Sequence, residues 1–140
     1  MSTPKSRLLR SPWRPGPAHA ASGTPVLVSV TDFTALGHGQ AGAIALAGLR
    51  LRRTWARTPG AVGMWLWTDP RGKRSGSVSV WADERSLGDF VARPDHLRTV
   101  RAHRGRGTMR ATSWTAERFD PQDVWAAARL FLTRSTKGIS

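Results

Sequence analysis

The chain has 140 residues, no cysteine and a formal net charge of +13 at pH 7. A chain of this length forms one domain with one hydrophobic core, and the lack of cysteine excludes disulfides, a thiolate nucleophile and cysteine-ligated metal centres. No segment approaches the roughly 18 to 20 apolar residues of a membrane-spanning helix, so we expect no membrane insertion.

Residues 1–24 combine proline, glycine and basic residues without apolar periodicity, so we predict a disordered basic tail. The tail lacks the apolar run of a secretory signal, which predicts a cytoplasmic protein. Only three of the 22 basic residues are lysine (Lys5, Lys73 and Lys137), a bias that is typical of GC-rich genomes. The charge alone therefore does not indicate specific nucleic-acid binding.

The first half of the domain is predicted to be a strand, a helix and a hairpin. Residues 25–33 are rich in β-branched side chains and predict a strand. Apolar residues then recur at helical spacing over residues 40–58, before a Pro-Gly pair. Residues 61–68 and 76–81 predict two strands, which the turn-forming residues 69–72 connect.

The second half is predicted to be a kinked helix, a strand and a last helix. Asp83 can cap a helix, and Pro94 interrupts its apolar pattern, so we expect a kink there. Residues 108–116 alternate as a strand does. Asp120 and Pro121 are typical of a helix start, and the helix that follows has one apolar face.

This order of elements predicts an α+β domain of the ferredoxin-like β-α-β-β-α-β type over residues 25–132, with a disordered C-terminus over residues 133–140. We therefore expect a four-stranded antiparallel sheet with helices on one face, which would leave the other face open.

The second predicted strand is apolar on both faces. Met64 and Leu66 share one face, and Trp65 and Trp67 share the other. We therefore predict a homodimer through the open face. Two alternatives are that this strand lines a large internal pocket or that it meets the last helix.

Residues 77–104, SVSVWADERSLGDFVARPDHLRTVRAHR, carry a family resemblance. They place Trp81 at a strand end, an acidic cap before the Leu87 and Phe90 helix face, and His96 before a basic helix. With residues 51–60, this string resembles the dimeric α/β-barrel superfamily, specifically the antibiotic-biosynthesis-monooxygenase and spheroidene-monooxygenase-like proteins. The resemblance covers about residues 25–130. It implies oxygenation of a flat aromatic or polyene hydrophobic substrate, either without a cofactor or with haem.

His96 is the first candidate for the chemistry that the resemblance implies. It is either the base that deprotonates the substrate or the axial ligand of a haem. His103 is a second candidate ligand, and Arg98 or Arg101 could pair with the haem propionates. The competing interpretation of His96 is a solvated residue at a helix start, and we predict no metal-ion site.

The aromatic side chains are either core residues or walls of a substrate cavity. Seven tryptophans and no tyrosine predict broad apolar walls with few hydroxyl donors. The residues expected to contact substrate are Phe33, Trp65, Trp67, Trp81, Phe90 and Trp114.

Three other functions are weighed against a monooxygenase. An RNA-recognition motif needs exposed aromatics on its third strand, where this chain has Ser75, Ser77 and Val80. Haem-degrading enzymes similar to this family use an Asn and a Trp where this chain has Asp32 and Phe90. A non-catalytic dimeric ligand-binding protein stays open as the main alternative, and nonspecific nucleic-acid binding is a weaker one.

Overall fold

The computed structural model describes residues 8–19 and 24–134. It contains a six-stranded sheet, four α-helices and one short 3-10 helix. The elements in chain order are β1 (Leu9–Arg10), β2 (Arg14–Pro15), β3 (Val26–Ala35), α1 (His38–Arg53), η1 (Trp55–Arg57), β4 (Ala61–Asp69), β5 (Arg74–Trp81), α2 (Glu84–Val91), α3 (Pro94–His103), β6 (Gly107–Ala116) and α4 (Pro121–Arg134).

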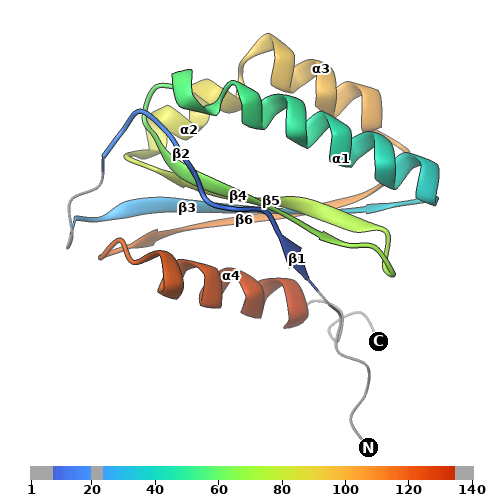
Figure 1. Ribbon diagram of the computed structural model, residues 1–140. Coiled ribbons are helices and arrows are strands. Elements are labelled where there is room, and N and C mark those ends of the chain that lie inside the picture. The colour runs from blue at the N-terminus through green and yellow to red at the C-terminus, as the bar shows by residue number, and fades with distance from the viewer. Residues whose placement is uncertain (1–7, 20–23, 135–140) are drawn as a thin grey trace, which may run out of the picture.

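The sheet has the ferredoxin-like strand order that the sequence predicts. Its strands follow the order β1-β4-β5-β3-β6, β2 also pairs with β4, and every pairing is antiparallel. Helices α1, α2 and α3 cover one face, and α4 covers the other (Figure 1). The predicted kink is a break, because α2 ends at Val91 and Pro94 is the first residue of α3. Proline is well tolerated at that position, since its missing N–H has no helical partner there.

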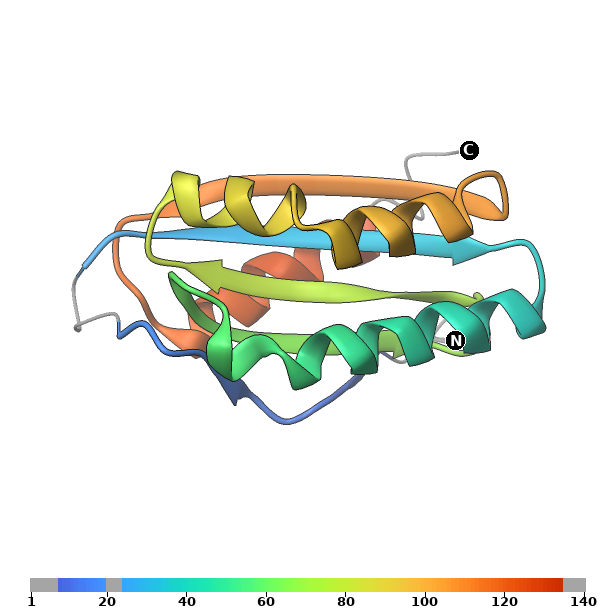
Figure 2. The same cartoon turned by 90° about the horizontal axis from the view of Figure 1, so that it is seen from above.

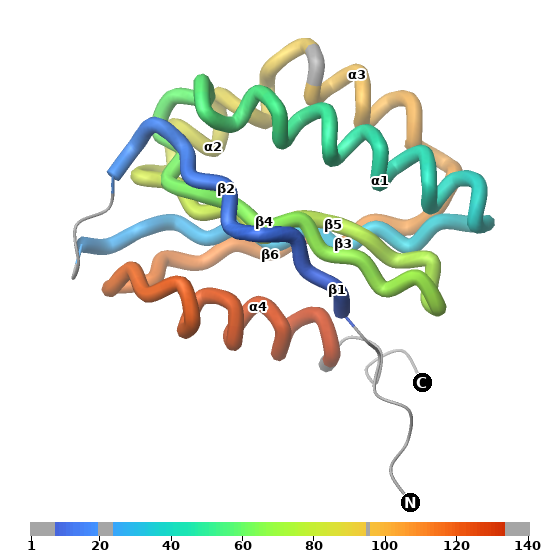
Figure 3. Tube along the Cα trace, viewed as in Figure 1, coloured from blue at the N-terminus to red at the C-terminus, as the bar shows by residue number. Residues whose placement is uncertain are grey.

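Part of the segment predicted to be disordered is a strap along the edge of the sheet. Residues 8–19, which we call the N-terminal strap, run beside β4 (Figure 3), with Leu9 paired to Thr68 and Arg14 to Met64. The prediction of disorder over residues 1–24 is therefore wrong for the strap. An edge strand has unpaired backbone groups, and the strap supplies their partners. Residues 1–7, 20–23 and 135–140 lie outside the described part of the chain.

Trp13 is the anchor of the N-terminal strap. Its ring lies 4.5 Å from that of Trp65 and 5.9 Å from that of Phe119, measured between centroids. Gly63 makes room for this ring, because a Cβ atom at Gly63 would overlap Trp13. The Nη2 atom of Arg52 also donates to the Pro12 carbonyl at 3.1 Å, which ties the strap to the end of α1.

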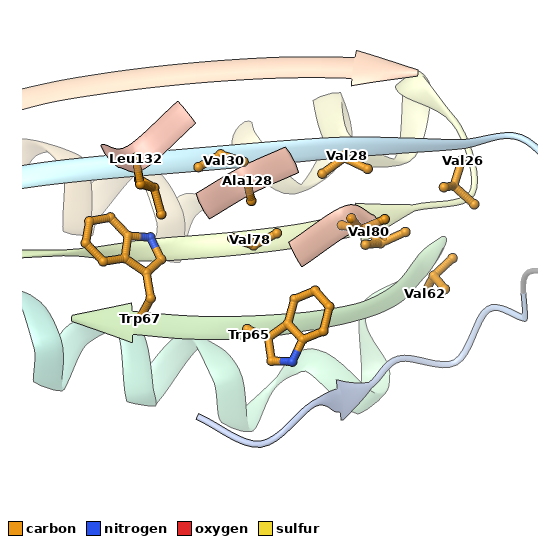
Figure 4. Packing of buried hydrophobic residues seen from close by; sticks show 11 residues of the cluster. Val26, Val28, Val30, Val62, Trp65, Trp67, Val78, Val80, Ala128 and Leu132 are labelled. Atoms are coloured by element: carbon orange, nitrogen blue, oxygen red, sulfur yellow. The ribbon is translucent and has the colours of Figure 1, made fainter. Parts of the chain in front are cut away.

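The α4 side of the sheet holds the larger part of the hydrophobic core. Alternate residues of the central strands lie on this side with Trp65 and Trp67 of β4 (Figure 4). Their partners on the last helix are Val124, Ala128 and Leu132. The tryptophan face of β4 is thus covered within one chain, as the second alternative allowed. The homodimer stays a prediction. The observation that suggested it, an uncovered tryptophan face, does not hold, because α4 covers this face.

A buried ion cluster fixes the end of α4 to the sheet. Arg74 donates from Nη2 to Asp32 Oδ2 and to the Leu132 carbonyl, both at 2.8 Å, and from Nε to Asp32 Oδ1 at 3.3 Å. Arg110 forms a second ion pair with Asp32. Removing one member of a buried ion pair typically costs about 3–5 kcal/mol, because the remaining charge stays buried without a partner. Asp32 is therefore a structural residue.

We predict that Gly63→Ala displaces the N-terminal strap from β4. The added methyl group must occupy the position of the Trp13 ring, and overpacking of this kind costs about 1–3 kcal/mol. Limited trypsin digestion should then cut faster after Arg10, because the bond after Arg14 precedes Pro15 and resists trypsin. Gly88→Ala is the matched control, because a Cβ atom at Gly88 meets nothing within 4 Å. Equal cleavage rates in both variants would contradict the role of Trp13 as the anchor.

Candidate functional site

A cavity of about 500 Å³ lies between the sheet and helices α1, α2 and α3. This volume is within the usual range for a small-molecule site. In the view from above, α1 lies over one side of the sheet and α2 with α3 over the other (Figure 2). Leu9, Arg10 and Ser11 of the N-terminal strap also line the cavity, so the strap forms part of its wall.

The floor of the cavity is a row of hydroxyl groups. Strand alternation places every second residue of β3 and β5 on this face, opposite the valines of the α4 side. The hydroxyl residues of these two strands that line the cavity are Ser29, Thr31, Ser75, Ser77 and Ser79. The prediction of walls with few hydroxyl donors is therefore wrong. The alternating sequence of residues 76–81, GSVSVW, was the signal that could have located this floor.

Two of the floor hydroxyls form a pair at the centre of the sheet. Thr31 Oγ1 and Ser77 Oγ lie 3.0 Å apart, and the backbone N–H of Ser77 donates to Thr31 Oγ1 at 3.0 Å. One of the two hydroxyls donates to the other, so the pair keeps a second hydroxyl hydrogen for a ligand.

The roof of the cavity is mostly apolar and comes from the helices. Its apolar residues include Ile44, Gly48 and Leu51 of α1 and Leu87 and Phe90 of α2. An apolar roof above a hydroxyl floor suits a flat hydrophobic molecule that carries oxygen atoms.

Aromatic rings close one end of the cavity. The Trp55 ring lies 4.9 Å from that of Trp81 and 5.9 Å from that of Phe90, and both pairs are edge-to-face. Trp55 and Phe90 line the cavity, whereas Trp81 is fully buried behind them and donates from Nε1 to Ser79 Oγ at 2.9 Å. Trp55 was predicted only as a residue of a helix face, because nothing in its spacing distinguishes a wall residue from a core residue.

Hydrogen bonds of two charged residues hold the roof helices in place. Asp83 caps α2, and its Oδ1 accepts from the backbone N–H and from the hydroxyl of Ser86, both at 2.8 Å. These bonds lower the pKa of Asp83, so the cap is complete above the ordinary pKa of aspartate and is lost as pH falls through the lowered value. Arg93, at the start of α3, donates from Nη1 to Thr58 Oγ1 at the end of η1 at 3.1 Å and from Nη2 to Thr54 Oγ1 at the end of α1 at 3.2 Å.

His96 lies in the cavity wall, at the start of α3. Its ring is 5.1 Å from that of Phe90, and its Nδ1 lies 3.2 Å from the Val91 carbonyl oxygen. Because a carbonyl can only accept, this bond places a proton on Nδ1. In the neutral ring, Nε2 then holds the lone pair that a base needs. The structure thus places His96 in the cavity wall, and its catalytic role stays a prediction.

The other predicted wall residues divide between the two faces of the sheet. Phe33 and Phe90 line the cavity. Trp67 reaches the cavity lining, but its ring packs in the core on the α4 side and donates from Nε1 to the Thr31 carbonyl at 3.1 Å. Trp65 and Trp114 also pack on the α4 side and do not line the cavity, so their predicted role is corrected. A shift of one position along a strand exchanges the faces, and the sequence did not reveal which face the last helix covers.

The residues do not fit the predicted arrangement for haem. Arg98 and Arg101, the predicted propionate partners, are exposed and lie outside the cavity lining. Arg10 does line the cavity, but its guanidinium lies over the rings of Trp65 and Trp125. We therefore derive no step through haem.

Several other kinds of site are also absent from the described residues. Within them, no group of three or more His, Asp or Glu side chains could hold a metal ion. None of their helices is long and apolar enough to cross a bilayer. Helices cover both faces of the sheet, which leaves no open platform for base stacking.

Comparison with known proteins relates the chain to solved structures only. No protein-family profile and no curated protein sequence matches it. A mutant of SnoaB, a cofactor-independent oxygenase from Streptomyces nogalater, is 24% identical over 69% of this chain and 97% of that chain, with a TM-score of 0.57. LmHde, a heme-degrading enzyme from Listeria monocytogenes, is 16% identical over 79% and 72%, with a TM-score of 0.55.

A third solved structure relates the fold to a wider group. It is an uncharacterized ferredoxin fold protein from Listeria monocytogenes related to antibiotic biosynthesis monooxygenases, 16% identical over 66% of this chain and 57% of that chain, with a TM-score of 0.54. The chain has the fold of these monooxygenase-like proteins. The resemblance predicted from residues 77–104 is confirmed at the level of the fold, and a fold by itself does not determine the reaction.

We predict that Ser77→Phe closes the cavity. The larger side chain rises from the centre of the floor, so binding of naphthalene should weaken at least tenfold, while the α4 side stays unchanged. Ser113→Phe is the control. Ser113 lies on the neighbouring strand β6, where it pairs with Ser29 of β3, and it does not line the cavity. Isothermal titration calorimetry of both variants tests this, and full naphthalene binding by Ser77→Phe would contradict the location of the site.

Proposed function

We propose that the protein is a monooxygenase that oxidises a hydrophobic aromatic or polyene substrate in this cavity without a cofactor. The observation that carries the proposal is His96, with Nδ1 tied to the Val91 carbonyl, in the wall of a cavity whose roof is apolar. The description of SnoaB as a cofactor-independent oxygenase of the same fold supports it.

The reaction requires a substrate that is itself the reductant. His96 takes a proton from an acidified C–H group, and the resulting carbanion transfers electrons to dioxygen. For a methylene group the overall change is CH₂ + O₂ → C=O + H₂O, in which one oxygen atom enters the product and the other leaves as water. The substrate supplies all the electrons that reduce dioxygen, so no external reductant enters the balance.

The floor hydroxyls can stabilise the negative charge that deprotonation of the substrate creates. Deprotonation next to a carbonyl places negative charge on its oxygen, and a fixed hydrogen-bond donor stabilises such an oxyanion more strongly in a water-poor site than in water. The Thr31–Ser77 pair keeps one hydroxyl hydrogen for this task. The apolar side chains of the roof reduce the contact of the carbanion with water, which would otherwise protonate it again.

We predict that the protein accelerates the oxidation of anthrone, a flat tricyclic ketone with an acidic methylene group. His96→Ala should slow it by about 10²–10⁴-fold, the usual contribution of a positioned general base. His38→Ala is the matched control, because His38 is exposed at the start of α1. Oxygen uptake at neutral pH measures the rate, and labelled oxygen gas shows one labelled atom in the anthraquinone product.

Two outcomes would decide against this proposal. Saturable binding of anthrone without oxygen uptake above the spontaneous rate would favour the alternative of a non-catalytic ligand-binding protein. Activity that appears only after added haem, with a saturable shift of the haem absorption band, would show that the cofactor-free route is wrong.

A further inference from the structure

His103 is a second histidine in the cavity wall, and the proposed reaction does not use it. It follows His96 by seven residues, which is two turns of α3, so both rings lie on the same side of the helix. The separation along the helix axis is about 10 Å at 1.5 Å per residue. His103 lies beside Phe33 at a centroid distance of 6.2 Å, whereas His96 lies beside Phe90. The two histidines therefore stand at different ends of the cavity.

The surroundings of His103 determine which ring nitrogen carries its proton. Its Nδ1 is buried and has no hydrogen-bond partner among the described residues. A buried N–H without an acceptor is rarer and more costly than an unused lone pair. The neutral ring of His103 therefore carries its proton on Nε2, which is the opposite tautomer from that of His96.

The two tautomers give the ends of the cavity different hydrogen-bonding character. At the Phe90 end, Nε2 of the neutral His96 ring is an acceptor. At the Phe33 end, Nε2 of His103 is a donor. An apolar ligand that spans both ends thus meets an acceptor at one end and a donor at the other.

We propose that the cavity binds an elongated apolar ligand at two points, and that His103 is a positioning residue that donates to a carbonyl oxygen. The hydroxyl or acidic C–H group of the ligand then lies at His96. This inference rests on the proposed function in placing the reacting group at His96, and it adds the ligand class: a flat molecule about 10 Å long with a proton donor at one end and an acceptor at the other. The floor hydroxyls between the two ends contact its ring edges.

Three naphthalene probes separate the two contacts. The first carries a hydroxyl group at one end and an acetyl group at the other, the second is naphthol, and the third is acetylnaphthalene. Wild-type protein should bind the first probe most tightly in calorimetric titrations without any turnover. His103→Leu should weaken the two acetyl probes by about tenfold and leave naphthol unchanged, because only the acetyl oxygen loses its donor.

Two further variants serve as controls. His103→Gln keeps an N–H donor at this place and should restore part of the affinity for the acetyl probes. His96→Leu should show the reverse selectivity, with weaker binding of the two hydroxyl probes and unchanged binding of acetylnaphthalene. Thermal midpoints of the three variants confirm that each one folds.

The outcomes distinguish this inference from the proposed function. Equal weakening of all three probes by His103→Leu, or no weakening at all, would overturn two-point binding even if the wild-type protein oxidises anthrone. Selective weakening of the acetyl probes supports two-point binding, including in a protein that shows no oxygen uptake.

Discussion

Side chains of a strand alternate between the two faces of a sheet, and the rest of this structure depends on how that alternation divides two residue classes. On β3 and β5 the valines lie on the α4 side, and the serines and Thr31 lie on the side of α1, α2 and α3. One face thus forms a close-packed core with α4, and the other forms the floor of the cavity. A shift of one residue in the register would bury the hydroxyls under α4 and place the valines and tryptophans in the cavity.

The chain's own last helix covers the α4 side of the sheet. The last helix packs on the tryptophan face of β4, and the ion cluster of Asp32, Arg74 and Arg110 fixes the end of that helix. The N-terminal strap pairs with the edge of β4 and contributes to the cavity wall. A dimer would thus have to form through surfaces other than the tryptophan face of β4.

The sequence predicted the elements well because local signals define them. Pro94 and the Asp120-Pro121 pair mark helix starts through backbone chemistry that holds in any fold, and the alternation in β5 identifies a strand. The sequence also singled out His96, which lines the cavity, and its role stays a prediction. It failed where a tertiary partner decides the outcome: Trp65 and Trp114 fit a cavity wall as well as a core, and the strap has no periodicity until β4 provides its partner. His103 was predicted only as a second candidate haem ligand, although helical spacing from His96 places both rings on one side.

The most direct test of this account is to locate a bound ligand by the methyl resonances of the protein. In a naphthol titration, the methyl shifts of Leu51, Leu87 and Val100, which line the cavity, should change in a saturable manner. Those of Val28, Val78 and Val80, which pack on the α4 side, should stay fixed, although Val78 is the immediate neighbour of Ser77 in the floor. Saturable changes confined to the α4-side valines would contradict the account, because the ligand would then bind in the core and not in the cavity above the hydroxyl floor.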